Sequence, residues 1–172
     1  MNTRQITGIV IHCSGTPDGQ WINAHEIDQA HLALGFKRDE GYRQRFNSLL
    51  HAVGYHFIVY PNGASATGRH LKEPGQHTKT HNQKTVAICL VGTNKFTQAQ
   101  WSMLRDLVKL LTIEKYFPGA RVAGCNELPG EDRNSPGFSV AEWQAIGMQP
   151  LPDHIYIGTD SIRPEPISGA LT

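Results

Sequence analysis

The sequence predicts an α/β fold of the α+β type, in which a central mixed β-sheet is flanked by helices. Residues 7–13 and 85–91 carry apolar side chains at both odd and even positions, the pattern of central strands that are covered on both faces. Asn23, Thr97 and Ser139 are each followed three residues later by Glu or Gln, which is the capping pattern of a helix start. Helices and strands therefore alternate along most of the chain, and helices should pack on the faces of the sheet.

In the first half of the chain, Asn23 is expected to begin a helix with His31 on its apolar face. Residues 37–51 are polar and basic, which predicts a surface insertion with one short helix. A strand over 53–60, a turn at Pro61-Asn62-Gly63 and a weak returning strand over 64–68 should form a hairpin.

In the second half, Thr97 is expected to begin a long helix that runs to about Tyr116. A strand over 120–123 follows, and the loop over 124–138 leads to a short helix closed by Gly147. The apolar stripe of the long helix consists of Trp101, Leu104, Leu107, Val108 and Leu111.

The 172 residues are long enough for one well-buried core, and we assign residues 1–147 to a single domain. Residues 148–172 carry four prolines and no lasting periodicity, so we expect an extended C-terminal tail with one edge strand at 154–157. The part after about residue 158 offers few apolar side chains and should contribute little to folding.

The composition excludes several classes of partner. Sixteen basic and fifteen acidic residues are interspersed, so neither nucleic acid nor an anionic membrane surface is an expected partner. No segment approaches the ~18 apolar residues of a membrane span, and the N-terminus lacks the apolar stretch of a secretory signal. Three cysteines without a framework spacing favour a reducing compartment. We expect a monomer that is made in the cytoplasm without a signal peptide.

Most of the nine histidines have an ordinary interpretation. His31 is interpreted as a core histidine held by one hydrogen bond. His12 differs, because it stands near the carboxyl end of a predicted central strand, where ligands usually bind in α/β sheets. Polar surroundings predict surface positions for His25, His51, His70 and His154.

A second group of chemically capable residues lies in predicted loops. Cys125 and Arg133 belong to the loop over 124–138, His77 lies in a glycine-containing stretch, and Tyr55 follows Gly54. A cluster of His, Tyr and Cys brought together by several strands suits a zinc hydrolase, in which the metal activates water and a side chain stabilises the oxyanion.

Six segments resemble, in order, the motifs of the N-acetylmuramoyl-L-alanine amidase family, which includes phage lysozyme-like amidases and animal peptidoglycan recognition proteins. The resemblance runs from about residue 6 to residue 147 and implies an amidase-like fold. It also implies a zinc cofactor, peptidoglycan muramyl peptide as the partner, and action on the bacterial cell wall. The segments are Ile9 to Ser14, Val53 to Ile58, Pro74 to His77, His81-Asn82, Ala87 to Gly92 and Phe96 to Trp101.

The resemblance implies roles for particular residues. His12 matches the first zinc ligand, and Tyr55 matches the tyrosine that holds the attacking water or the substrate carbonyl. His77 matches a histidine that lines the cleft, and Arg133 falls where the family has an oxyanion-stabilising lysine. His81 and Asn82 are expected to contact the substrate.

Two positions depart from the family pattern. The family has histidine at the start of the last loop and Cys or Asp ten residues later, where this chain has Cys125 and Ser135. Cys125 could bind zinc as a thiolate, but a neutral hydroxyl at Ser135 is a poor ligand. Either Asp132 or Glu127 supplies the missing ligand, or zinc binds weakly or not at all.

Two functions follow from these observations. The first is a zinc amidase of phage-endolysin type that cleaves the bond between the lactyl group of N-acetylmuramic acid and L-alanine, with His12, Tyr55 and Arg133 at the reacting centre. The alternative is a catalytically inactive peptidoglycan-binding module of the same fold, which Cys125 and Ser135 favour.

Overall fold

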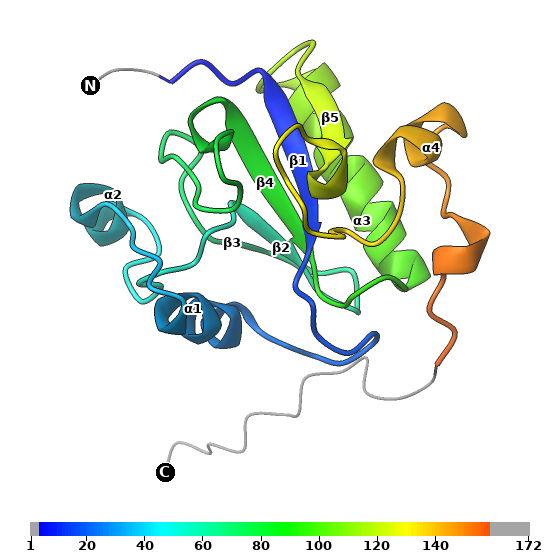
Figure 1. Cartoon of the computed structure of the whole chain (residues 1–172), viewed down its shortest axis with the longest axis horizontal. Helices are drawn as coiled ribbons and strands as arrows, with labels where there is room; N and C mark the ends of the chain where they lie inside the picture. Colours follow the sequence, from blue (N-terminus) through cyan, green and yellow to red (C-terminus); the bar gives the residue numbers. More distant parts are fainter. Residues whose placement is uncertain (1–3, 159–172) are drawn as a thin grey trace.

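A five-stranded mixed sheet forms the centre of the computed structural model, which describes residues 4–158 (Figure 1). The long central strands β1 and β4 are parallel to each other, β5 joins the other side of β1 in parallel, and β2 and β3 form an antiparallel hairpin at the far edge. This confirms the predicted fold class. The order across the sheet is β3 (Ser65–Thr67), β2 (Phe57–Val59), β4 (Thr85–Leu90), β1 (Gly8–Cys13) and β5 (Arg121–Gly124).

Helices cover both faces of the sheet, as the two-sided apolar strands predict (Figure 1). One face packs under α3 (Gln98–Lys109) and α4 (Val140–Ala145), with Ile9 and Ile11 of β1 in that core. The opposite face carries Ala87 and Cys89 of β4 and packs toward α1 (Ala24–Ala33). Side chains alternate along a strand, so His12 of β1 lies on the α1 face, opposite to Ile11.

The helices begin at the residues that the sequence predicts. Asn23 and Thr97 each form a complete capping box, with Glu26 and Gln100 as the reciprocal partners. The insertion forms one short helix, α2 (Glu40–Arg45), as predicted. The long helix keeps α-helical geometry only to Lys109 and continues as a wider π-helical turn over Leu110–Glu114.

The strand predicted over 53–60 is shorter than expected, because only Phe57–Val59 joins the sheet. The backbone N–H groups of Val53 and Gly54 are instead donated to side chains of α1, Asp28 Oδ1 at 2.7 Å and His31 Nδ1 at 2.9 Å. This segment therefore ties α1 to the sheet, and His31 is a core histidine as predicted.

The chain remains packed on the domain beyond the boundary predicted at residue 147. Leu151 is 5% exposed and belongs to the core under α3. His154 and Tyr156 exchange backbone hydrogen bonds with Phe96 at 2.9 Å, and an isolated parallel bridge joins Phe96 to Ile155. The predicted edge strand is reduced to this bridge, and the part of the predicted tail after residue 158 lies outside the described residues.

A buried polar cluster fixes the insertion to the rest of the domain; we call it the scaffold cluster, and it consists of Arg4, Arg38, His56, Arg69 and Glu73. The side chains of Arg38 and Glu73 are fully buried and form a two-pronged ion pair at 2.7 and 3.1 Å. Arg69 donates to three backbone carbonyls, among them Val53 O and Pro74 O. The segment between Val53 and the loop at residue 76 is thereby held in place.

Within residues 4–158, none of the helices combines the length and the apolar character needed to cross a membrane.

Candidate functional site

A cleft of about 420 Å³ opens beside the carboxyl end of β1, on the α1 face of the sheet. Its floor is formed by the small residues that follow the strand, Cys13 to Thr16. One wall is apolar and comes from α1 and the residues on either side of it, and the other comes from the loop around Arg133. The apolar wall consists of Ile22, Ile27, Ala30, Leu34 and Phe36.

A chain of hydrogen bonds fixes the protonation pattern of the two central histidines. The Thr85 hydroxyl donates to His81 O at 2.8 Å, so its only hydrogen is used and its oxygen must accept from His77 Nε2 at 3.4 Å. His77 Nδ1 is then an acceptor, and it receives the N–H of His12 Nε2 at 3.0 Å. The remaining nitrogen of His12, Nδ1, therefore carries a lone pair and no hydrogen.

That nitrogen is the unusual atom of the site. His12 is fully buried, and its Nδ1 is one of three buried side-chain N or O atoms within the described chain that have no hydrogen-bond partner. Burial, with Arg133 as a second cause, lowers the pKa of His12 to about 3. The imidazole is neutral at physiological pH, and the Nδ1 lone pair is unshared within the described residues.

Tyr55 packs between His12 and His31, with ring centroids 5.3 and 5.0 Å away. Its ring is 7% exposed and lines the cleft. Burial, followed by the nearby Cys89 thiol, raises the pKa of Tyr55 well above its ordinary value. The phenol thus remains protonated and can donate a hydrogen bond to a substrate oxygen.

Arg133 contacts Cys125, the first of the two residues that depart from the family pattern. Its Nη2 donates to Cys125 Sγ at 3.4 Å, to Glu131 Oε2 at 3.3 Å and to the carbonyl of His77. The Glu131 side chain is fully buried and also accepts the Cys125 thiol at 3.7 Å and the N–H of Lys79. We call His12, His77, Cys125, Glu131 and Arg133 the cleft cluster.

Ser135, the second residue that departs from the family pattern, supports the carboxyl end of β1. Its Oγ accepts the backbone N–H of Cys13 at 3.0 Å, and the Cys13 thiol points to the same oxygen at 3.7 Å. Its carbonyl accepts the N–H of Asn126 at 2.8 Å, which closes the loop. The side chain is therefore part of the architecture that holds β1 against the loop.

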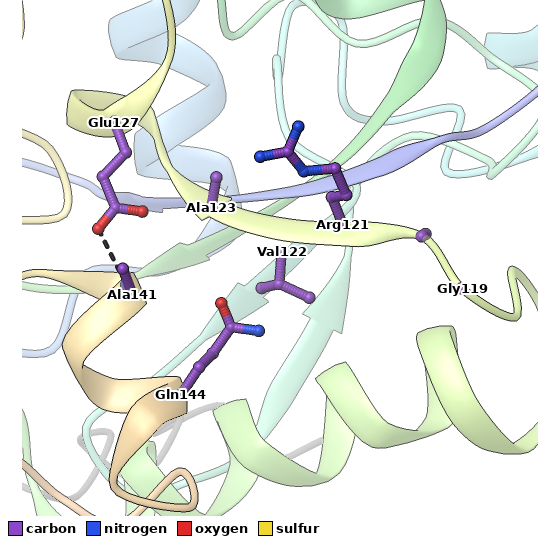
Figure 2. Close-up of a pocket in the computed structure, with 8 residues that line it drawn as sticks. Gly119, Arg121, Val122, Ala123, Glu127, Ala141 and Gln144 are labelled. Atoms are coloured by element: carbon purple, nitrogen blue, oxygen red, sulfur yellow. Dashed lines mark hydrogen bonds between the residues drawn. The ribbon is translucent and has the colours of Figure 1, made fainter.

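The zinc ligands that the sequence offered as replacements for Ser135 lie elsewhere. Glu127 points toward α4, where its carboxylate accepts the N–H of Ala141 at 2.9 Å and that of Gly124 at 3.0 Å (Figure 2). Asp132 is exposed and pairs with Lys79 at 3.0 Å. Both expectations are wrong, because the loop turns these two carboxylates away from Cys125.

The residues present do not fit a three-ligand zinc site. Among residues 4–158, no three His, Cys, Asp or Glu side chains are grouped so that they could hold a metal ion. His12 Nδ1 is a suitable donor, but Cys125 lies against a guanidinium. Burial also raises the pKa of the Cys125 thiol to about 11, so the thiolate form that zinc requires is disfavoured.

His81 and Asn82 organise the loop that carries His77 and are not among the residues lining the cleft. Asn82 Oδ1 accepts the N–H groups of His77 and Thr78 at 2.9 and 3.0 Å. His81 Nε2 donates to Pro129 O at 3.1 Å. Both residues thus help to position His77, and their contact with substrate stays a prediction.

Glu131 is the member of the site that the sequence interpretation missed. The sequence shows that Glu131 lies six residues after Cys125, but Asp132 and Glu127 in the same loop have the same charge. An irregular loop has no periodicity from which to tell which of the three carboxylates turns inward. Gly130, which has a φ of +81°, allows the loop to turn directly before it.

Fold and site together define a small α/β domain with a hydrolase-type cleft at the carboxyl ends of its strands. The sequence profile of the N-acetylmuramoyl-L-alanine amidase family matches residues 2–138. The chain therefore belongs to this family, and peptidoglycan amide hydrolysis is the function that the family defines.

Individual relatives agree with this assignment. The chain is 30% identical over 143 residues to an endolysin of Escherichia phage T7, covering 78% of this chain and 83% of that protein. It is 28% identical over 148 residues to an endolysin of Klebsiella phage KP32, with 81% and 86% covered.

Solved structures show the same fold. The amidase LysC from Clostridium intestinale superposes with a TM-score of 0.65 at 20% identity, over 86% of this chain and 89% of that one. Drosophila PGRP-LB in complex with tracheal cytotoxin gives a TM-score of 0.62 at 18% identity, over 86% and 85%.

Proposed function

We propose that the cleft binds the muramyl peptide of peptidoglycan and that His12, Tyr55 and Arg133 act on the amide between the lactyl group and L-alanine. Support comes from one observation above all, the buried lone pair of His12 Nδ1, which is left without a partner by a chain of hydrogen bonds. A buried polar atom without a partner is costly unless a ligand satisfies it.

The reaction adds water across the amide bond. The water oxygen bonds to the lactyl carbonyl carbon while its proton moves to His12 Nδ1, and that proton then goes to the L-alanine nitrogen as the C–N bond breaks. A base with a pKa of about 3 removes a proton from water inefficiently, so we expect slow turnover compared with a base poised near neutral pH.

The developing oxyanion requires a positive partner and a neutral donor. Arg133 and Tyr55 both line the cleft with His12 buried behind them, and the guanidinium stays charged at every relevant pH. A positioned donor of this kind typically contributes a factor of roughly 10² to 10³ in rate. Charge stabilisation, rather than proton removal, is thus the stronger contribution that this site can make.

A binding module remains the second candidate function. The observation that favours it is the use of both departing residues for internal contacts, Ser135 with the N–H of Cys13 and Cys125 with Arg133. In that case the same cleft would retain the muramyl peptide without cleaving it.

The test is to incubate the protein with purified peptidoglycan, count newly exposed α-amino groups and identify L-alanine-terminated peptides by mass spectrometry. We expect release by the parent and by His25→Ala, a change on the exposed side of α1, and at least a tenfold loss in His12→Asn. Co-sedimentation with peptidoglycan but no release of amino groups would assign the binding function instead.

A further inference from the structure

The guanidinium of Arg133 is held in an arrangement resembling the coordination of a cation. A single nitrogen, Nη2, faces three acceptors from two segments: Cys125 Sγ and Glu131 Oε2 of the loop over 124–138, and the carbonyl of His77. In the described chain, Nε and Nη1 have no protein partner, although half of the side chain is covered. One end of the guanidinium is anchored, and the other remains free to donate.

The three acceptors indicate that Nη2 of Arg133 occupies the place of a metal ion. Cys125 occupies the position at which the family carries a metal-binding histidine, and it contacts Arg133 at 3.4 Å. Glu131 supplies a buried carboxylate that compensates the positive charge. A metal ion at Cys125 would have to displace the guanidinium and break its pairing with Glu131.

We propose that Arg133 takes the place of the metal cation in this chain, so that the guanidinium, and not zinc, polarises the carbonyl in the cleft. This rests on the proposed function, which it deepens by naming the electrophile. Glu131 and Cys125 anchor Nη2, and the free donor Nη1–H binds the lactyl carbonyl oxygen and the oxyanion that forms from it. The parallel donor pairs of a guanidinium, Nε with Nη2 and Nη1 with Nη2, both include the anchored nitrogen, so the oxygen is bound through one free nitrogen.

A competing arrangement would have Glu131, Cys125 and His12 Nδ1 bind zinc together, but these three groups would first have to move toward one another, because they are not grouped for a metal ion within residues 4–158. The present contacts favour the guanidinium, since Glu131 and Cys125 are both bonded to Arg133. The two arrangements differ in metal content, which can be measured without reference to activity.

The first measurement is zinc content by elemental analysis of the purified chain, before and after dialysis against a chelator. We expect less than roughly 0.1 zinc per chain in the parent at both stages, and no rise in its melting temperature on adding zinc. Arg133→Met should bind zinc at least about tenfold more tightly than the parent, because Cys125 and Glu131 are released. One zinc per parent chain would overturn the proposal.

The second measurement is hydrolysis of peptidoglycan with and without chelator. We expect the parent to be unaffected by the chelator, Arg133→Met to lose roughly 100-fold in rate, and Arg133→Lys to lose less. Arg121→Met on the exposed edge strand is the matched control and should retain the parent rate. Loss of parent activity with the chelator, restored by added zinc, would contradict the assignment.

Failure of the proposed function can be told apart from failure of this inference. If no form of the protein hydrolyses peptidoglycan, the amidase mechanism fails, and binding of a soluble muramyl peptide replaces rate as the readout. At least a tenfold weaker binding by Arg133→Met, with Arg121→Met unchanged and the parent free of zinc, would still support the guanidinium as the cationic group. Equal binding by both variants would overturn it.

Discussion

Two buried polar clusters lie in this domain, and they differ in how completely their atoms are paired. In the scaffold cluster, Arg38 donates to both oxygens of Glu73 and to three backbone carbonyls, so its nitrogens are fully used. In the cleft cluster, counting contacts within residues 4–158, His12 keeps a free buried nitrogen and Arg133 is bonded through Nη2 alone.

This difference in pairing distinguishes polar residues that hold the fold together from polar residues that serve a function. A fully satisfied buried ion pair fixes one conformation, which the insertion and the segment after β3 require. An incompletely satisfied cluster next to an open cleft costs stability and is retained where a ligand completes it. Both clusters hold histidine and arginine, so pairing, and not composition, distinguishes them.

The largest expected effect comes from restoring the family ligands in the cleft cluster. Cys125→His combined with Ser135→Cys should raise zinc affinity by roughly 100-fold or more, because three protein ligands with one open position are the usual catalytic arrangement. Competition with a chromophoric chelator measures it. Each single change should do less than the pair. A double variant with unchanged affinity would mean that the cleft differs from the family in more than these two residues.

Substitutions in the scaffold cluster should lower the stability of the domain more than substitutions in the cleft cluster. Glu73→Gln leaves Arg38 buried without its counter-charge, and we expect the free energy of unfolding to fall by about 3 to 5 kcal/mol in urea denaturation. Glu40→Gln, in the exposed pair with Arg43, is the control and should cause no measurable change. Glu131→Gln in the cleft cluster should cost less than Glu73→Gln, since Arg133 is half exposed. An equal cost would remove the distinction between the clusters.

The smallest effect concerns pH. Burial, with the charge of Arg4 as the second cause, lowers the pKa of His56 from 6.5 to about 3. Below pH 6.5 the unfolded chain takes up a proton that the folded chain refuses, so this stability is complete above pH 6.5 and is lost as the pH falls toward 3. One such residue contributes a slope of up to about 1.4 kcal/mol per pH unit.

Urea denaturation at pH 7, 6 and 5 measures this slope. His56→Asn should be less stable at pH 7, yet lose less stability on acidification than the parent. A variant with the parent slope would assign the pH dependence to the other buried histidines, such as those of the cleft cluster.

The sequence by itself determined the class of fold and pointed to several residues of the cleft. Two-sided apolar strands and capping boxes depend on local spacing, so Asn23 and Thr97 begin their helices as predicted. His12 was singled out because it stands near the carboxyl end of a buried strand, where ligands usually bind in α/β sheets. The family motifs then brought Tyr55, His77 and Arg133 to the same cleft, and all three line it.

Only the tertiary structure decided which polar groups pair. The inward turn of Glu131, the outward turns of Glu127 and Asp132, and the role of Ser135 at the end of β1 depend on loop conformation, which has no periodic signal. The same holds for the segment at 53–56, where α1 side chains take the backbone donors that a strand would use. Leu151 likewise packs into the core through contacts far away in the sequence. Local spacing specifies elements, whereas pairing between distant polar groups is fixed only when the whole chain has folded.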